Sequence, residues 1–224
     1  MPAIAFINPK GGAGKTTAAL VLGLGLVERG ESVVMIDADP NKPLLYWGAM
    51  AGRPERLTIY PAPTAPDVRD AYTAARRRGA DWIILDTEGS ERGAMAFTAV
   101  RPDLVLTPMA GSQMEAVQAV KAAGMVKAFG RRGGRDIPHR CLLTRIPPAI
   151  RTKSLKVLVD RVRGQQIDFL ATALLEKEAF RALFLVGGGF QSLEAAGVSG
   201  VAAARSNASA YVDAVLELVA LKAA

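Results

Sequence analysis

A glycine-rich stretch near the amino terminus, Ile-Asn-Pro-Lys-Gly-Gly-Ala-Gly-Lys-Thr-Thr at residues 7–17, limits the possible folds more than any other feature. The apolar run at 3–7 before it predicts a strand, and the alanine- and leucine-rich run at 18–27 after it predicts a helix. A glycine-rich turn from a strand into a helix directs backbone N–H groups at an anion, most often phosphate. The stretch therefore predicts a phosphate-binding loop within an α/β fold.

The side chains of this loop suit the triphosphate of a nucleotide. Glycines let the backbone approach an anion closely, the Lys15 ammonium can neutralise the β- and γ-phosphates, and the Thr16 hydroxyl can bind Mg²⁺. The loop differs from the standard P-loop pattern, because Pro9 stands where a glycine is expected and Lys10 follows it. The predicted nucleotide-binding residues are Gly11, Gly12, Ala13, Gly14, Lys15, Thr16 and Thr17.

The segment Lys10 to Thr17 resembles the deviant Walker A box of the ParA/MinD family of ATPases, in which the first lysine is the signature. In that family, this lysine reaches across a nucleotide-sandwich dimer to the phosphates of the partner. The resemblance implies ATP and Mg²⁺ as cofactors, catalytic roles for Lys10 and Lys15, and a homodimer that forms with ATP. It also implies slow ATP hydrolysis that an activating partner accelerates.

Strand-like and helix-like runs alternate along nearly the whole chain, and half of its residues are hydrophobic. Uninterrupted apolar strands joined by helices predict an α/β fold with a mostly parallel sheet covered by helices on both faces, as in P-loop NTPases. The length of 224 residues favours a single domain, 1–224. A helix over 176–184 is expected to stop at the glycines 187–189, and Ser206 or Asn207 is expected to cap a last helix that ends at Lys222. The strands expected after the first lie at 32–37, 57–60, 82–86, 104–109 and 140–144.

Two acidic residues lie at the carboxyl end of the strand at 32–37. Asp37 is the last residue of the strand, and Asp39 follows two residues later, just before Pro40. Ligands of parallel sheets bind at the carboxyl ends of the strands, so these acids should lie beside the glycine-rich loop. The segment Asp37 to Pro40 is similar to the Asp-x-Asp-Pro motif of ParA-like proteins. That resemblance implies that Asp39 helps to hold the attacking water and that Asp37 lies near the metal.

A further acid, Asp86, ends the apolar strand at 82–86. The segment Ile83 to Thr87 looks like a Walker B motif, which assigns Asp86, together with Thr16 and Asp37, to the surroundings of Mg²⁺. Glu88 follows directly and has two interpretations, a surface residue or an additional group that polarises water; the surface interpretation is favoured.

Two solitary residues do not indicate catalysis. Cys141 is the single cysteine and lies in an apolar run, so it predicts a buried thiol. One cysteine excludes an internal disulfide and argues against the iron–sulfur relatives of this group, which use two cysteines per subunit. His139 has no acid and nucleophile arranged around it in the sequence and is expected to be structural or exposed.

Positive charge is concentrated in one segment, where ten Lys and Arg at 131–163 accompany only Asp136 and Asp160. A localised basic surface favours a polyanionic partner, and the absence of aromatic residues favours contacts to duplex phosphates over base stacking. A solvated basic face remains the alternative. Arg145 either stacks on the nucleotide base or belongs to this surface. The predicted DNA-binding residues are Arg151, Lys153, Lys156, Arg161 and Arg163.

The expected function is that of a short, ParF-like ParA without an N-terminal helix-turn-helix, because a strand is predicted from residue 3. Such a protein binds DNA non-specifically as an ATP dimer and uses hydrolysis, stimulated by a ParB-like adaptor, to segregate or position DNA. The acids in the last helix weaken a membrane-binding interpretation, and no export signal is evident, so a cytoplasmic, nucleoid-associated protein is expected. Two alternatives stay open: an accessory ATPase that recruits a relaxosome in conjugative DNA transfer, and an ATPase that positions a protein cargo.

Overall fold

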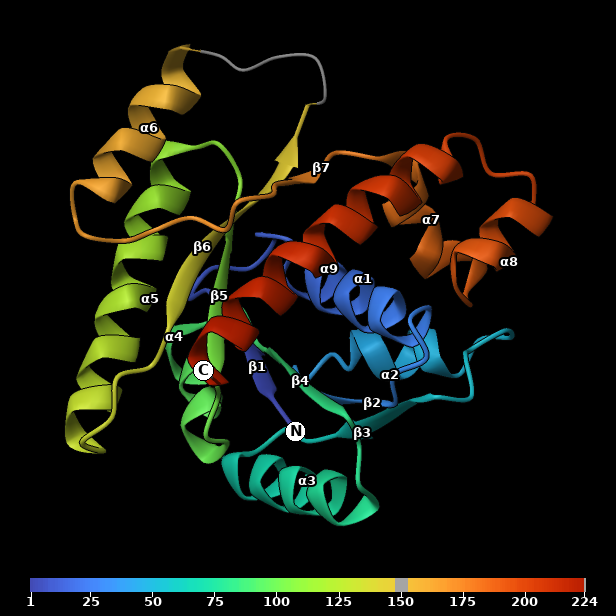
Figure 1. The fold of residues 1–224 in the computed structure, drawn as a ribbon, viewed down its shortest axis with the longest axis horizontal. Coiled ribbons are helices and arrows are strands. Elements are labelled where there is room, and N and C mark those ends of the chain that lie inside the picture. The colour runs from blue at the N-terminus through green and yellow to red at the C-terminus, as the bar shows by residue number, and fades with distance from the viewer. Residues whose placement is uncertain (148–152, 224) are drawn as a thin grey trace.

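The computed structural model describes residues 1–147 and 153–223 and contains a seven-stranded sheet in the order β3-β2-β4-β1-β5-β6-β7. Every pair of neighbouring strands is parallel, which confirms the predicted α/β class. The carboxyl ends of all strands therefore lie along one edge of the sheet (Figure 1). The strands are β1 (Ala3–Phe6), β2 (Val33–Ala38), β3 (Leu57–Pro61), β4 (Trp82–Thr87), β5 (Leu104–Met109), β6 (His139–Ile146) and β7 (Leu174–Leu175).

Helices cover both faces of the sheet, as expected from its buried strands (Figure 1). One face packs against α1 (Lys15–Val27), α2 (Pro43–Gly48), α7 (Glu178–Val186), α8 (Phe190–Ala195) and α9 (Val201–Ala223). The other packs against α3 (Ala65–Arg78), α4 (Glu91–Ala94), the 3₁₀ helix η1 (Met95–Ala99), α5 (Gln113–Arg132) and α6 (Lys153–Arg163). Within the described ranges, no helix is both long enough and apolar enough to cross a bilayer.

The sequence signals at the ends of α3 explain its bounds. Thr64 and Asp67 form a capping box, in which the Thr64 hydroxyl accepts a hydrogen bond from the Asp67 amide and the Asp67 carboxylate accepts one from the Thr64 amide. Gly79 ends the helix with a φ of 72°, a left-handed conformation that glycine adopts without strain. The helix thereby places three consecutive arginines at the amino edge of the sheet, immediately before β4.

The predicted start of the last helix is wrong. Helix α9 begins at Val201, and Asn207 lies inside it rather than at its N-cap. The Asn207 side chain instead donates to the carbonyl of Ala173 (2.9 Å) and accepts from the amide of Leu175 (2.8 Å), which secures the short strand β7. The glycines at 187–189 also do more than stop a helix, because they separate α7 from α8, an element that the sequence did not predict.

The two solitary residues are structural, as predicted. Cys141 is buried in β6, where burial raises the pKa of its thiol to about 12 and keeps it protonated. Nε2 of His139, in the same strand, lies 2.9 Å from the Thr107 hydroxyl on the neighbouring β5. Burial, and secondarily the charge of Arg140, lowers the pKa of His139 to about 4, so the ring is neutral at physiological pH.

This low pKa predicts that folding stability falls on acidification. An unfolded histidine takes up a proton near pH 6.5 whereas the folded one resists until about pH 4, so its stabilising contribution is present above pH 6.5 and is lost between these values. Because the ring is partly exposed, we expect a loss of about 2 kcal/mol rather than the full linkage value. Urea unfolding should show that the free energy of unfolding falls less between pH 7 and pH 4.5 in His139→Gln than in the wild type. Glutamine keeps a hydrogen-bond partner for Thr107. Equal losses in both proteins would contradict the assignment.

Candidate nucleotide-binding site

The glycine-rich loop lies at the carboxyl end of β1 and leads directly into α1. In the sheet, β1 is flanked by β4 and β5. Gly12 and Gly14 have φ values of 82° and 84°, which residues with a Cβ rarely adopt. Helix α1 begins at Lys15, so its first backbone amides face the loop. The predicted phosphate-binding segment thus has the geometry of an anion site.

Two buried polar side chains, neither predicted from the sequence, hold this loop in place. Nδ2 of Asn8 donates to the carbonyl of Pro108 in β5 (2.8 Å), while its Oδ1 accepts from the Lys10 amide (2.9 Å). The hydroxyl of Thr144, in β6, donates to the Ala13 carbonyl (2.9 Å). The backbone of Lys10 is therefore fixed. Within the described parts of the chain, its ammonium group forms neither an ion pair nor a hydrogen bond.

Lys15 is buried at the start of α1, and its Nζ donates to the Lys10 carbonyl (3.2 Å). Burial lowers the pKa of Lys15, and the charges of Asp86, Asp39 and Glu88 oppose that shift. The structure therefore brings the predicted catalytic lysine close to Asp86 in β4 and to the acids that directly follow β2 and β4. Glu88 is half-buried and acts on Lys15, which gives the less favoured interpretation of this residue more weight than the sequence did.

Asp37 and Asp86 are register partners on the neighbouring strands β2 and β4. Both are fully buried, but their contacts differ. Asp37 accepts hydrogen bonds from the backbone amides of Leu45 (3.0 Å) and Asp39 (3.3 Å), so it anchors the start of α2. Burial raises the pKa of Asp37, and these amides oppose the shift.

Neither carboxylate oxygen of Asp86 has a hydrogen-bond partner among the described residues. Burial raises the pKa of Asp86 to about 7, while the nearby Thr16 hydroxyl and the Lys15 ammonium counteract this shift. An unpaired buried carboxylate beside a hydroxyl is a donor set that suits a hard cation such as Mg²⁺. The residues present therefore fit the predicted metal, with Asp86 and Thr16 as the better candidates and Asp37 next to them.

Asp39 lies at the turn between β2 and α2, partly exposed. One of its oxygens accepts from the backbone amide (2.8 Å) and from the side-chain amide (3.0 Å) of Asn41, which holds the carboxylate in an Asx turn. Its charge reaches Lys15, so it lies on the phosphate side of the site, where the predicted water-holding role requires it.

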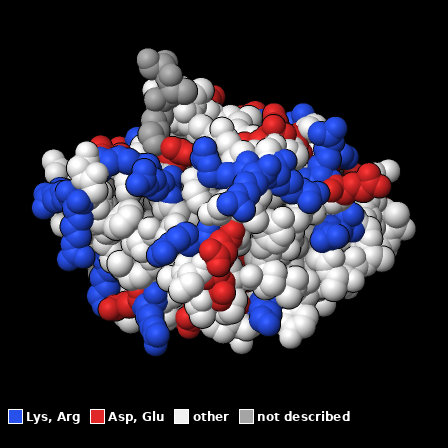
Figure 2. Space-filling model, turned by 90° about the horizontal axis from the view of Figure 1, so that it is seen from below, with Lys and Arg blue, Asp and Glu red and all other residues white. Residues whose placement is uncertain are grey.

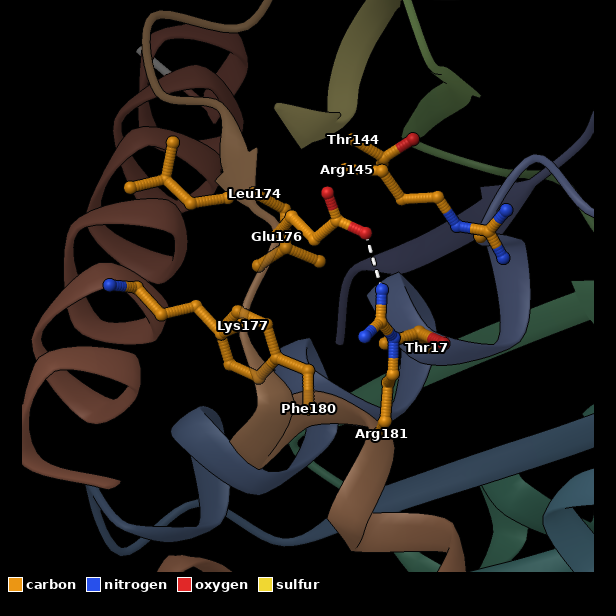
Figure 3. Close-up of a pocket in the computed structure, with 10 residues that line it drawn as sticks. Thr17, Thr144, Arg145, Leu174, Glu176, Lys177, Phe180 and Arg181 are labelled. Carbon is orange, nitrogen blue, oxygen red and sulfur yellow. Dashed lines mark hydrogen bonds and ion pairs between the residues drawn. The ribbon is translucent and has the colours of Figure 1, made fainter. Parts of the chain in front are cut away.

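A cavity of about 270 Å³ adjoins the loop and is the candidate pocket for the nucleoside (Figure 3). Arg145 lines it beside Gly14 and Thr17, and its backbone has a φ of 55° at an irregular position of β6. This placement favours the base-side interpretation of Arg145 over membership of a basic surface. The remaining lining comes from one segment: Leu174, Leu175, Glu176, Lys177, Phe180 and Arg181, together with Thr144.

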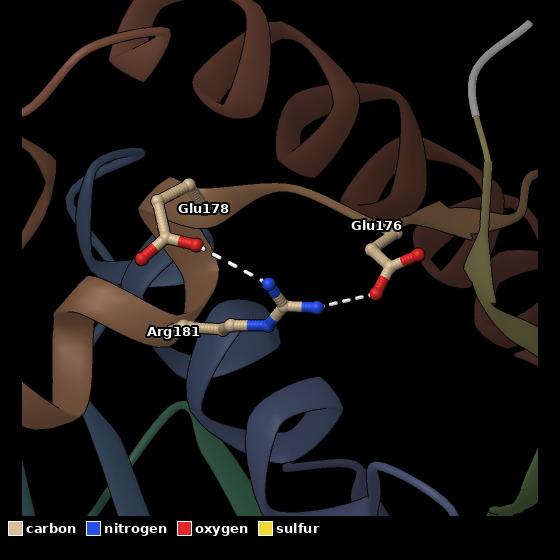
Figure 4. Close-up of polar contacts among 3 residues, drawn as sticks. All are labelled: Glu176, Glu178 and Arg181. Carbon is tan, nitrogen blue, oxygen red and sulfur yellow. Dashed lines mark hydrogen bonds and ion pairs between the residues drawn. The ribbon is translucent and has the colours of Figure 1, made fainter.

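An ion-pair cluster forms the far wall of this pocket. The Arg181 guanidinium lies between Glu176 and Glu178, pairing with both carboxylates, the latter at 3.2 Å (Figure 4). Glu176 and Arg181 point into the cavity, whereas Lys177 points away from Thr17 (Figure 3). Sequence reasoning missed this wall because its residues belong to a helix start about 160 residues from the glycine-rich loop, and no local motif marks them.

The predicted DNA-binding residues are exposed where the structure describes them. Lys153, Lys156, Arg161 and Arg163 lie on α6, whereas Arg151 falls outside the described residues. Arg161 donates to Gln113 on α5 (3.3 Å), and the Arg163 guanidinium lies 5.9 Å from the centre of the Phe169 ring.

The basic segment 131–163 does not form one surface. Arg131 and Arg132 precede β6 at the amino edge of the sheet, and Lys153 follows β6 at the carboxyl edge. A strand of this length separates its two ends by roughly 25 Å. The positive charge of this segment, which the sequence predicts on one surface, is therefore divided between the amino and carboxyl edges of the sheet.

Comparison with known proteins places this site in a family. The sequence model described as "VirC1 protein" matches residues 1–223. The chain belongs to the VirC1 family. It is also 30% identical to Protein ParA of Rhizobium radiobacter, with 97% of each chain covered. The family model and this relative place the chain among the ParA/MinD-type ATPases, as the resemblance of Lys10 to Thr17 predicted.

A further relative is similar in sequence, and solved structures are similar in fold. The chain is 25% identical to maintenance of carboxysome distribution protein A of Halothiobacillus neapolitanus, over 80% of this chain and 81% of that protein. Its fold is similar to that of a Cyanothece McdA variant bound to ATP (TM-score 0.73, 15% identity, 96% of each chain). It is also similar to MinD of Pyrococcus horikoshii with Mg-ADP (TM-score 0.71, 17% identity, 99% of this chain and 98% of that one).

Proposed function

We propose that this VirC1-family protein is an ATPase that dimerises with ATP, binds duplex DNA non-specifically in that state, and uses slow, partner-stimulated hydrolysis to segregate or position DNA. The observation that carries the proposal is the contrast between its two lysines. Lys15 is buried and engaged within its own loop, whereas Lys10 has a fixed backbone and an uncommitted ammonium at the edge of the site. A cation held in this way is placed to act on phosphates outside its own subunit.

Each residue of the site then has a role in phosphoryl transfer. The loop amides and Lys15 would hold the β- and γ-phosphates. Thr16 and Asp86, with Asp37 alongside, would hold Mg²⁺, and the ion would supply charge neutralisation when bound. Asp39 orients the attacking water. Lys10 of the opposite subunit completes the neutralisation, so hydrolysis depends on dimer formation. An adaptor of the ParB type would act by favouring this complete arrangement.

The α6 residues support the DNA component of the proposal by their position. Helix α6 starts just beyond the carboxyl end of β6, on the same edge of the sheet as the glycine-rich loop. Dimerisation through that edge would bring two copies of the helix into one assembly and double the number of cations facing a duplex. Binding through Lys153, Lys156, Arg161 and Arg163 is therefore expected to require ATP.

Lys10→Ala tests this mechanism. We expect the variant to bind ATP within about threefold of the wild type, because Lys15 and the loop amides are retained. It should stay monomeric with ATP in light-scattering chromatography, lose ATP-dependent binding of a random duplex in fluorescence anisotropy, and hydrolyse ATP at least tenfold more slowly. A wild type that remains monomeric with ATP, or a variant that dimerises normally, would overturn the proposed mechanism.

Two other functions use the same ATPase core. The relationship to maintenance of carboxysome distribution protein A favours positioning of a protein cargo, for which DNA serves only as the support. An accessory role in conjugative transfer is the second alternative, and it predicts protection of a transfer origin over random duplex in footprinting. Identification of the proteins that co-purify with the ATP-bound dimer would separate cargo positioning from DNA segregation.

A further inference from the structure

Six exposed arginines lie at the amino edge of the sheet, opposite the nucleotide site. Each precedes a strand: the end of α3 comes before β4, the segment after η1 before β5, and the end of α5 before β6. Figure 2 looks onto this edge and shows Lys and Arg side chains spread across it, with some acids between them. The six arginines are Arg76, Arg77, Arg78, Arg101, Arg131 and Arg132.

These arginines make few contacts within the fold, and the guanidinium of Arg76 donates a hydrogen bond to the Tyr72 hydroxyl (3.4 Å). None of the six forms an ion pair with another described residue, whereas Arg29, Arg140, Arg181 and Arg205 all do. The side chain of Arg76 lies over the Tyr72 ring, with 5.8 Å between its guanidinium and the ring centre. A basic last turn does suit the dipole of a helix. That effect fades within one turn and does not account for Arg101, which lies outside any helix.

The topology places the arginines in a row. Strands β4, β1, β5 and β6 are consecutive neighbours in the sheet, so the starts of β4 and β6 are three strand spacings apart, roughly 14 Å, and the helix ends that carry the arginines lie further apart than these starts (Figure 1). Helices α3 and α5 and the 3₁₀ helix η1 share one apolar cluster, in which the Phe97 and Phe129 rings are 5.3 Å apart. The row is therefore held on a rigid base.

We infer that this row, the amino-edge arginines, is a second binding surface for the phosphates of duplex nucleic acid, and that it acts without ATP. A duplex presents one negative charge per roughly 1.7 Å of axis, so a surface that spans several strand spacings meets several phosphates. Guanidinium groups bind phosphate oxygens through two parallel hydrogen bonds, which lysine does not. All six residues are arginine.

A duplex fits this surface better than a lipid membrane does. Helices that bind membranes pair their cations with large apolar side chains that enter the lipid. The exposed positions of α3 carry no such residue, since they are Ala65, Pro66, Arg69, Asp70, Thr73, Ala74 and the three terminal arginines.

Independence from ATP follows from the location of the surface. A dimer formed through the carboxyl edge leaves the amino edges at its two outer ends, where neither the nucleotide nor Lys10 reaches them. Each subunit would then present this surface as a monomer, with ADP, or as a dimer. The protein would then bind DNA through this surface in every nucleotide state, whether or not it also binds DNA through α6 as an ATP dimer.

The test compares two triple variants that remove equal charge. Arg76, Arg77 and Arg78 are replaced with alanine in one, and Lys153, Lys156 and Arg163 in the other. Anisotropy of a labelled random duplex of 20 base pairs is measured with no nucleotide and with ADP over a salt series. We expect the α3 triple variant to bind at least tenfold more weakly than the wild type, with a salt slope lower by roughly 2.7, and the α6 triple variant to lose less affinity than the α3 one.

Controls separate this result from other causes. Arg→Lys changes at the same three positions keep the charge and the helix-end interaction, so they should restore the salt slope and leave affinity about two- to threefold below that of the wild type. Circular dichroism reports whether each variant folds. The wild type should bind equally with ADP and with no nucleotide, which distinguishes this surface from the ATP-dependent one.

Several outcomes would overturn the inference. One is a wild type that does not bind the duplex without ATP, and this outcome leaves the proposed function intact. Another is an equal loss in both triple variants, which indicates non-specific charge alone. A third is binding to phosphatidylglycerol vesicles, lost in the α3 triple variant, in the absence of any duplex binding, which assigns the surface to a membrane.

Discussion

Replacing Lys15 with alanine is expected to weaken ATP binding at least 100-fold and to abolish turnover. The Nζ atom lies within its own loop, against the Lys10 carbonyl, at the start of α1. An ammonium in contact with phosphate at a partly buried site contributes about 4 kcal/mol of attraction, and no other buried cation is available among the described residues of the loop. Titration with a fluorescent ATP analogue measures the loss directly.

Lys177→Ala is the matched control for this variant. Lys177 borders the same cavity, but its side chain points away from Thr17 (Figure 3). Removing it deletes the same charge near the same pocket without touching the phosphate side, so ATP affinity should change less than threefold. Equal losses in the two variants would show that general positive charge, rather than the position of Lys15, determines binding.

The phosphate side of this site could be predicted from the sequence because its determinants are local. The turn from β1 into α1 is continuous in the chain, and Asp37 and Asp86 each end a strand whose apolar residues identify it. Parallel pairing then brings those strand ends to one edge without further information. This reasoning gave the fold class correctly and brought the loop and the acids to one edge of the sheet, where the structure has them.

The base side and the basic surface could not be predicted in the same way, because they depend on distant packing. The wall formed by Glu176 and Arg181 reaches the loop only after the chain has passed through β7. Asn207 looked like a helix cap, but its contacts with β7 override local preference. Charges adjacent in the sequence at 131–163 lie on opposite edges because β6 runs between them.

Gly89→Ala is expected to disrupt the nucleotide site from a position outside any motif for phosphate binding. A Cβ at this position would lie 2.6 Å from both the Cα and the N atom of Gly11, and 3.0 Å from the carbonyl carbon of Lys10. These are backbone atoms of the loop, and Asn8 holds that backbone in place, so the clash cannot be relieved by a side-chain rotation. We expect a loss of about 1–3 kcal/mol in folding stability and at least tenfold weaker ATP binding.

Gly124→Ala is the control for this substitution, because it adds the same methyl group where nothing lies within 4 Å, on an exposed position of α5. Alanine there should leave ATP affinity unchanged and raise stability by up to about 1 kcal/mol. If Gly89→Ala binds ATP normally, the loop that follows β4 must move away from the glycine-rich loop in the nucleotide-bound state. If Gly89→Ala binds ATP more weakly while Gly124→Ala binds normally, the loop after β4 and the glycine-rich loop stay in contact in the nucleotide-bound state. A movement of the loop that bears Glu88 would then shift the backbone of Lys10.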